Sequence, residues 1–370
     1  MKQRLEQVRF GVNYIPSERW WYAWNDFAEE SIARDLDAIA ALGADHLRIM
    51  LVWPYFQPNR AWVSEAHLDR LDRLMELAAE RGLDVCPALF TGWLSGWAFR
   101  PVFDAGADFY REESMREPAE RFMRACAARM SRHGNFLGFD LGNEMNCCWR
   151  TPDTRDGDRW MERFMTLAEE LCPDALHVNG VDHQPWFYPE TFSAGFLARR
   201  QRMIALHGWI EFTGALKRGT HRDRVCTRLV PAMAALARMH AGDMNKPVWL
   251  QEFGATAHWL PAGEIPSFLE ETVRASVGAG VGRITWWASH DIRPCFQFPE
   301  IEYDMGLLTS DNQPKAAGRV FKRLAAELGG RPVAIPALPA LPALPECQGN
   351  QSATAEATWR WLETVQAWVQ

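Results

Sequence analysis

The chain of 370 residues has a formal net charge of −7 and contains 18 tryptophans and 8 cysteines. No run of basic residues stands out, which argues against a nucleic-acid partner, and no apolar run is long enough to cross a membrane. The first residues lack the apolar core of a signal peptide, and the cysteines form no Cys-x-x-Cys motif. We therefore expect a cytoplasmic enzyme with reduced thiols and no membrane partner.

Short apolar runs typical of β-strands recur eight times and alternate with helical patterns. They cover residues 8–13, 46–51, 83–90, 135–144, 176–181, 202–207, 246–252 and 283–287. The apolar residues do not alternate with polar ones, a pattern that favours a parallel sheet covered by helices. Eight such units predict closure into a (β/α)8 TIM barrel, whereas five or six would have indicated an open doubly wound sheet.

The helices between these strands carry apolar residues at helical spacing. The first is expected to begin near Asn25 or Asp26, either of which can cap it, and the second to be capped by Ser64. The later barrel helices are expected over about 116–132, 158–171, 223–240, 264–277 and 314–328. The loops after the first, third and eighth strands are long and aromatic, and their rings either wall a pocket or pack on the barrel rim.

The character of the chain changes near residue 331. Residues 1–330 are predicted to form one catalytic barrel, and residues 331–370 a proline-rich extended segment followed by a short helix. The tail is too short to be a domain. We expect it to pack on the barrel or on a neighbouring subunit, which leaves a homo-oligomer open as an alternative.

Two of the predicted strands end in a glutamate, at Glu144 and Glu252. Catalytic groups of such barrels lie at the C-terminal strand ends, so we expect the two carboxyls to meet there. A facing pair about 5 Å apart suits a double displacement, in which one carboxyl attacks the sugar carbon and the other protonates the leaving oxygen. Each glutamate alone could equally serve as a charge at a helix N-terminus. The predicted strand ends also carry Asn13, Arg48, Asn143, His207 and Trp287.

The order of these groups resembles that of glycoside hydrolase family 5, over roughly residues 8 to 328. The resemblance implies that Glu144 is the acid/base, that Glu252 is the nucleophile, and that anomeric configuration is retained. It also implies that Asn143 binds the sugar 2-hydroxyl and that Arg48 orients Glu252. Arg48 is further expected to lower the pKa of the nucleophile. The other expected substrate-binding residues are His207, Trp209, Trp287, Trp53, Asn13, Trp93 and Asp291.

The sequence departs from the family pattern at two strand ends. The third predicted strand ends at Phe90 without the family's histidine, and the usual His-x-Tyr after the sixth is His207-Gly208-Trp209. The lost tyrosine puts its hydrogen bond to the nucleophile in question. Because side chains alternate along a strand, only one ring of the Trp286-Trp287 pair should face the site, and we favour Trp287.

Residues 10–17, 45–49 and 53–60 carry a closer resemblance, to a bacterial β-mannosidase subgroup of family 5. It implies exo-action on short oligosaccharides such as Man-β-1,4-GlcNAc. One alternative is an endo-β-1,4-glucanase or endo-β-mannanase with an open cleft. Another is a catalytically silent sugar-binding barrel, which would normally have lost one of the two carboxylates.

No cofactor or metal is expected, because the sequence contains no metal-ligand spacing and its one glycine cluster, at 278–282, precedes a strand rather than following one. The loop carboxyls of Glu211 and Glu302 are expected at the solvated surface.

Overall fold

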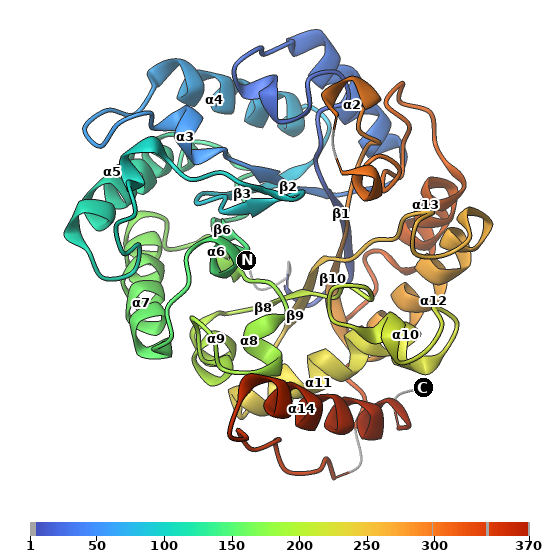
Figure 1. Cartoon of the computed structure of the whole chain (residues 1–370). Helices are drawn as coiled ribbons and strands as arrows, with labels where there is room; N and C mark the ends of the chain where they lie inside the picture. Colours follow the sequence, from blue (N-terminus) through green and yellow to red (C-terminus); the bar gives the residue numbers. More distant parts are fainter. Residues whose placement is uncertain (1–4, 298, 338–339, 369–370) are drawn as a thin grey trace.

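The computed structural model describes residues 5–297, 299–337 and 340–368. Eight parallel strands form one sheet in the order β7-β6-β3-β2-β1-β10-β9-β8 (Figure 1). The end strands β7 and β8 contact each other, so the sheet curls into a nearly closed barrel and the predicted (β/α)8 fold is confirmed. The strands are β1 (Arg9–Asn13), β2 (His46–Met50), β3 (Asp84–Ala88), β6 (Asp140–Asn143), β7 (Val178–Gly180), β8 (Ile204–His207), β9 (Val248–Glu252) and β10 (Val281–Trp286).

Helices surround this barrel and bury their apolar stripes against the strands (Figure 1). The longer ones are α2 (Glu29–Ala41), α4 (Glu65–Ala79), α5 (Glu113–Met130), α7 (Thr154–Leu171), α9 (Ala194–Arg200), α11 (Leu229–Ala241), α12 (Ile265–Gly278) and α13 (Ala316–Leu328). Short helices lie in the loops that follow the strands: α3 (Trp53–Phe56), α6 (Met145–Cys148), α8 (Gln184–Phe187) and α10 (Arg224–Thr227).

The predicted cap of the first helix was wrong, whereas Ser64 does occupy the N-cap position of α4 but makes no capping hydrogen bond through its side chain. Helix α2 begins at Glu29, after Ala28, because residues 20–24 form a separate 3-10 turn, η1 (Trp20–Trp24), whose tryptophans are buried. Ser64 does precede α4, but its hydroxyl bonds the ring of His67 at 2.8 Å instead of capping the helix. Polar residues near a helix start therefore indicated the helices here but not the capping contacts.

The loops after β3 and β10 meet above one side of the barrel. The first contains a small antiparallel hairpin, β4 (Trp93–Leu94) and β5 (Trp97–Ala98), that the sequence did not predict. The second contains two 3-10 turns, η5 (Pro294–Phe296) and η6 (Glu300–Glu302). A Cβ atom on Gly96, which has φ of +86°, would lie 3.2 Å from Pro299 Cγ, so glycine permits this close approach.

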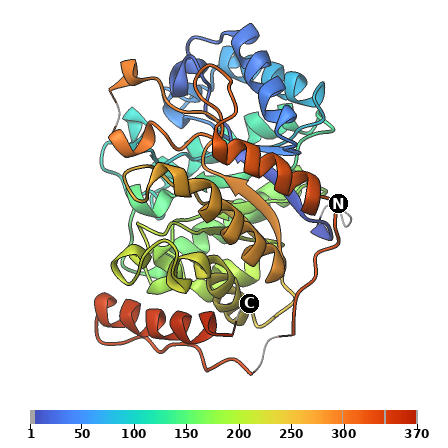
Figure 2. The ribbon, with the colours of Figure 1, turned by 90° about the vertical axis from the view of Figure 1, so that its right-hand side faces the viewer.

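The C-terminal tail lies across the outside of the barrel, where α14 (Gln351–Gln366) packs on α8, α10 and α11 (Figure 2). The hydroxyl of Thr358 donates to the carbonyl of Phe187 at 3.0 Å. The guanidinium of Arg218 stacks on the Trp359 ring, 4.7 Å from its centroid. The tail thus contacts its own barrel, and the boundary near residue 331 stays a prediction.

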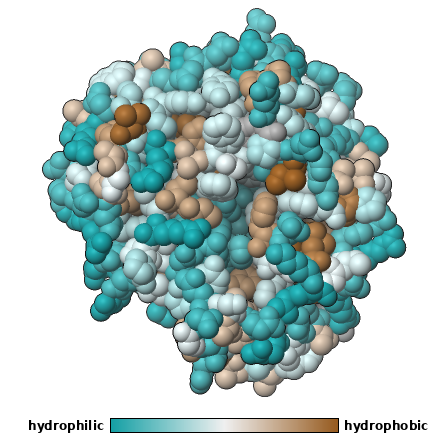
Figure 3. Space-filling model, viewed as in Figure 1, coloured by the Kyte–Doolittle hydropathy of each residue, from teal (hydrophilic) through white to brown (hydrophobic). Residues whose placement is uncertain are grey.

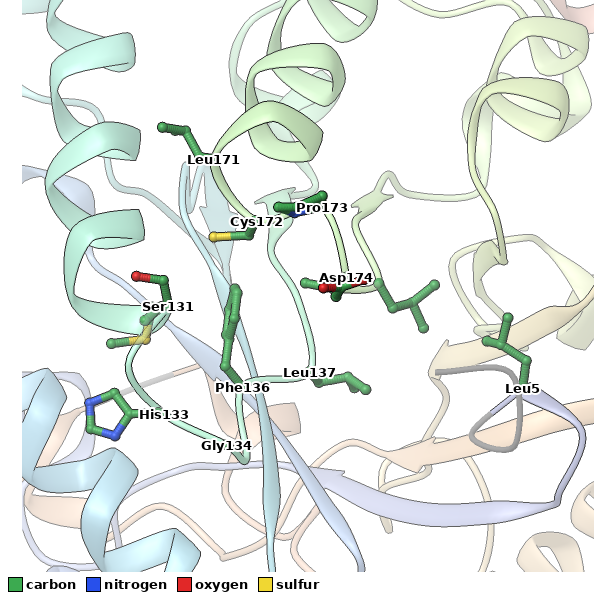
Figure 4. A pocket seen from close by; sticks show the side chains of 13 residues that line it. Leu5, Ser131, His133, Gly134, Phe136, Leu137, Leu171, Cys172, Pro173 and Asp174 are labelled. Carbon is green, nitrogen blue, oxygen red and sulfur yellow. The ribbon is translucent and has the colours of Figure 1, made fainter.

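A hollow lies at the N-terminal end of the barrel strands, among the loops that lead into them (Figure 4). Its lining includes Ser131, His133, Phe136, Cys172 and Asp174. Catalytic groups of (β/α)8 enzymes lie at the C-terminal end of the strands, away from this hollow.

Within the described residues, no helix combines the length and apolar character needed to cross a membrane.

Candidate active site

The two predicted glutamates come together at the C-terminal end of the barrel. Glu252 is the last residue of β9, and Glu144 directly follows β6 in a left-handed conformation with φ of 45°. The Nδ1 atom of His207 lies 2.8 Å from Glu144 Oε1 and 3.4 Å from Glu252 Oε2. One ligand-capable atom of each residue falls within 4.8 Å of the others. Residues 108 positions apart along the chain (252 minus 144) thus present facing carboxyl groups.

Glu252 is held by two N–H donors. Arg48 Nη1 donates to its Oε1 at 2.5 Å, and Trp209 Nε1 donates to its Oε2 at 3.2 Å. The indole of Trp209 therefore supplies a hydrogen bond where the family's tyrosine hydroxyl is missing. Burial raises the pKa of Glu252, while His207 and Arg48 oppose that rise. Arg48 acts in the direction we expected, but burial has the larger effect.

Arg48 is fully buried beneath the pair and joins side chains from several strands. It donates to Asn13 Oδ1 at 3.0 Å, to Asn143 Oδ1 at 2.7 Å and to Asp140 Oδ2 at 2.8 Å. Because these hydrogen bonds and the one to Glu252 hold the guanidinium of Arg48 in one orientation, the side chains of Glu252 and Asn143 are fixed relative to each other.

Glu144 has a different environment from its partner, although it too is largely buried. Its side-chain hydrogen bond is to His207, and no cation pairs with it directly among the described residues. Burial raises the pKa of Glu144 to about 8, with the negative charge of Asp182 adding to the rise and Arg48 opposing it. One carboxyl thus keeps its proton near neutral pH, while the other is held by cationic and N–H donors. This difference is what separates an acid from a nucleophile.

The pH dependence should follow from this difference. Glu144 must be protonated to act as an acid, so kcat/KM should fall as pH rises through about 8. Glu252 must be ionised to attack, so kcat/KM should also fall at low pH. We expect a bell-shaped profile of kcat/KM against pH, measured with a substrate whose leaving group needs protonation. A profile that stays flat through and above this alkaline range would contradict the assignment of Glu144 as the acid.

The facing carboxyls open into a pocket between the loops that follow the strands. In the view of Figure 1, the molecular surface is hollowed near the centre of the barrel, with hydrophilic and hydrophobic residues mixed around the hollow (Figure 3). The pocket is lined by Trp93, Ser95, Gly96, Asn143, Glu144, Trp209, Phe212, Glu252, Trp287, Pro299, Ile301 and Glu302. Aromatic rings beside a few polar groups are what a sugar-binding pocket needs.

Trp287 lines this pocket, whereas Trp286 is buried on the other side of β10 with its N–H on the carbonyl of Met305. Asn143 donates to the carbonyl of Trp93 at 2.6 Å, which ties the loop after β3 to the end of β6. His207 is buried between the two glutamates and does not line the pocket itself.

Besides His207, four residues expected to bind substrate do not line the pocket. Trp53 is fully buried among Phe90, Phe109 and other rings, because it follows β2 into the helical turn α3 and packs outward. Asp291 accepts from Lys315 Nζ at 2.8 Å and from the Gly306 amide, and so braces its own loop. Asn13 is buried below the pocket, where it orients Arg48. Arg48 also lies beneath the pocket rather than in its lining.

Glu302 was expected at the surface, and this expectation was wrong. The turn η6 folds it into the pocket, where its exposed fraction is 8%. Trp287 Nε1 donates to its Oε2 at 3.4 Å, and burial raises its pKa to about 7. A lone acidic residue in a long loop carries no sequence signal for this position.

Two further residues beneath the pocket were missed, Asp140 and Gln251. Both are fully buried and hydrogen-bonded to each other at 3.0 Å. Asp140 did have a sequence signal, since a charged residue inside an apolar strand must find a partner if it is buried.

A metal ion fits this site poorly. The atoms of Glu144, His207 and Glu252 are close enough to share an ion. However, the guanidinium of Arg48 already binds Glu252, and its positive charge would oppose a cation there. The donor set therefore suits a carboxyl pair working on an uncharged substrate.

A parallel barrel whose C-terminal end presents two facing glutamates in an aromatic pocket is the arrangement of the two-carboxylate glycosidases. No family model and no curated protein matches the sequence. Several solved structures, in contrast, match the chain. A subfamily 18 member of glycoside hydrolase family 5 from Streptomyces cattleya, in complex with GlcNAc, is 30% identical with a TM-score of 0.87, over 98% of this chain and 91% of that one.

A variant of that enzyme in complex with Manβ1-4GlcNAc is 30% identical with a TM-score of 0.85, over 97% of this chain and 92% of that one. An exo-β-1,4-mannosidase from Opitutaceae bacterium strain TAV5 is 25% identical with a TM-score of 0.77, over 87% of this chain and 60% of that one. The chain belongs to glycoside hydrolase family 5, in subfamily 18, and the resemblance drawn from the sequence is confirmed.

Proposed function

We propose that the protein is a retaining exo-β-mannosidase that releases mannose from short β-1,4-mannosides, with Man-β-1,4-GlcNAc as its substrate. The observation that carries this proposal is the pair of facing glutamates in different electrostatic environments, within a chain similar to enzymes solved with GlcNAc and Manβ1-4GlcNAc. The similar exo-β-1,4-mannosidase supports the same sugar and the same mode of action.

The reaction would proceed by double displacement. A carboxylate oxygen of Glu252 attacks the anomeric carbon while Glu144 gives its proton to the glycosidic oxygen, and the aglycone leaves as an alcohol. Glu144, now ionised, then takes a proton from water, whose oxygen displaces Glu252 from the sugar. One carboxyl oxygen of Glu144 lies within 4.8 Å of one of Glu252, and this closeness favours double displacement over inversion, which needs room for a water between the two groups.

Exo-action is supported by the contact between the loops after β3 and β10. The contact of Gly96 with Pro299 joins the two loops beside the pocket, and Ser95 and Glu302 lie on its wall there. A polysaccharide chain would need an opening at both ends of the cleft, so we infer that this side receives the non-reducing end of a short sugar. The 8 cysteines are unpaired thiols, which is compatible with the expected cytoplasmic location; that location stays a prediction.

An assay with three substrates tests this function. We expect release of mannose from Man-β-1,4-GlcNAc and from 4-nitrophenyl β-mannoside, with the β-anomer of mannose formed first in the proton NMR spectrum. Long mannan should lose single sugars from its ends at most. Rapid fall in mannan viscosity without hydrolysis of the small mannosides would instead identify an endo-acting enzyme, and no turnover of any of them would indicate a binding protein.

Replacing Glu302 with alanine should weaken sugar binding. We infer that its carboxyl accepts a hydrogen bond from a hydroxyl group of the terminal sugar. A hydrogen bond to a charged group contributes about 1.5–3 kcal/mol. The expected loss in kcat/KM for 4-nitrophenyl β-mannoside is therefore about ten- to a hundredfold. Glu300, an exposed residue of the same turn, is the matched control. Equal effects of Glu302→Ala and Glu300→Ala would argue that Glu302 does not contact the sugar.

A further inference from the structure

The buried carboxyl of Asp140 lies at the start of a chain of hydrogen bonds that ends at Glu144. Its Oδ2 accepts from Arg48 Nε at 2.8 Å and from Gln251 Nε2 at 3.0 Å. Its Oδ1 accepts from the amides of Gly180 at 2.7 Å and Gly142 at 3.3 Å. All of these partners are N–H donors, so Asp140 acts here only as a carboxylate acceptor.

This arrangement determines which way the side-chain amide of Gln251 faces. Because a carboxylate cannot donate, the NH2 group of Gln251 must point to Asp140, and its Oε1 must point the other way. That oxygen lies 3.1 Å from Nε2 of His207, and both side chains are fully buried. An amide oxygen can only accept, so Nε2 of His207 must carry a hydrogen.

The opposite nitrogen of His207 faces the catalytic pair. Burial lowers the pKa of His207, which favours the neutral ring, and a neutral imidazole carries only one N–H. With that hydrogen on Nε2, Nδ1 presents a lone pair to Glu144 Oε1 at 2.8 Å. The contact is a hydrogen bond only if Glu144 is the donor, which means that its carboxyl is protonated.

We propose that Gln251 is a positioning residue: its side-chain amide, oriented by Asp140, fixes His207 as the Nε2–H tautomer and thereby keeps the acid's proton on Glu144. The opposite tautomer would place a hydrogen on Nδ1, where it would stabilise the ionised form of Glu144. The inference rests on the proposed role of Glu144 as the acid, but Gln251 does not line the pocket and is not itself a catalytic residue.

Other charged and titratable groups around the histidine and Glu144 act on the same proton. Glu252 lies 3.4 Å from Nδ1, and its charge and the hydrogen bond to Gln251 both raise the pKa of His207, but burial has the larger effect and keeps the ring neutral. The remaining groups with an electrostatic effect on His207 or Glu144, or affected by one of them, are Arg48, Asp140, Asp182, His183, Cys147, Cys148 and Glu302.

The variant Gln251→Met tests the proposal, since it keeps the length of the side chain but removes Oε1. The alkaline limb of the kcat/KM profile should move down by about one pH unit, because roughly one hydrogen bond that favours the protonated acid is lost. At pH 9, kcat/KM for Man-β-1,4-GlcNAc should fall about tenfold, whereas at pH 7 it should fall only about twofold, because the pKa of Glu144 moves from about 8 to about 7. Hydrolysis of 2,4-dinitrophenyl β-mannoside should change little, because that leaving group needs no proton.

Gln201→Met is the matched control. Gln201 is equally buried and accepts from the amide of Asn179 at 2.8 Å, but it does not contact the catalytic pair. The Gln201→Met variant should have a lower free energy of unfolding. Its pH profile of kcat/KM and the ratio of its kcat/KM values for the two substrates should not change. Equal changes of that ratio in both variants would overturn the proposal.

Nitrogen-15 NMR of the unmodified enzyme gives a second test that does not depend on either variant folding. We expect His207 to show a protonated Nε2 and a pyridine-type Nδ1 at neutral pH. A doubly protonated ring, or a hydrogen on Nδ1 alone, would overturn the inference. This result can be read even if no mannoside is hydrolysed, so failure of the proposed function and failure of the inference are distinguishable.

Discussion

Glu252→Ala is expected to reduce turnover of 4-nitrophenyl β-mannoside by roughly four to six orders of magnitude, the range seen when an enzyme loses its nucleophile. The physical reason is that the other glutamate of the facing pair cannot take its place. Glu144 lacks the direct contact with Arg48 that holds Glu252 as a carboxylate, and its raised pKa keeps it protonated. The measurement is kcat from initial rates, with folding checked by circular dichroism.

Sodium azide makes the result specific to the nucleophile. In Glu252→Ala, azide can enter the space of the lost carboxyl and attack the anomeric carbon while Glu144 still protonates the leaving group. The product should be the α-mannosyl azide, with inverted configuration. Glu211→Ala is the control, because Glu211 is a loop carboxyl after β8 that does not line the pocket. If Glu252→Ala keeps more than a small fraction of turnover, the nucleophile lies elsewhere.

Glu144→Ala should show a loss that depends on the leaving group. Proton donation contributes typically 10²–10⁴-fold, and we expect the full loss of kcat/KM with Man-β-1,4-GlcNAc, whose leaving sugar alcohol needs a proton. With 2,4-dinitrophenyl β-mannoside, attack by Glu252 should stay fast, and the glycosyl-enzyme should accumulate as a burst because no base activates water.

Azide again separates the two roles. In Glu144→Ala, azide should speed release of the sugar from Glu252 and give the β-mannosyl azide, with retained configuration. Equal losses with both leaving groups, or an α-azide product, would show that Glu144 is not the acid/base. The two variants together therefore assign each glutamate from the stereochemistry of one product.

The barrel and its carboxyl pair could be predicted from sequence because both depend on the strands. The eight apolar runs were recognisable by composition, and a glutamate at the end of a run in a parallel barrel has only one end of the molecule to occupy. Strand β6 was the least regular, since the run from 135 forms a single bridge at Phe136 before the ladder begins at Asp140.

The pocket wall was less predictable because loops build it. Trp53 and Trp93 each lie just beyond a strand and look alike in sequence, yet one is buried in an aromatic cluster and the other lines the pocket. Glu302 reaches the site only through the path of a long loop. Gln251 was hidden for another reason: a register shift where β8 pairs with β9 lets two consecutive residues of β9 serve the same site.

The arginine network beneath the pocket suggests how related enzymes could diverge in the sugars they accept. Arg48 and most of its partners, Asn13, Asp140, Asn143 and Glu252, belong to strands, whereas Ser95, Pro299 and Glu302 belong to loops. Insertions or substitutions in those loops can reshape substrate preference while the frame that aligns the reacting groups is inherited unchanged.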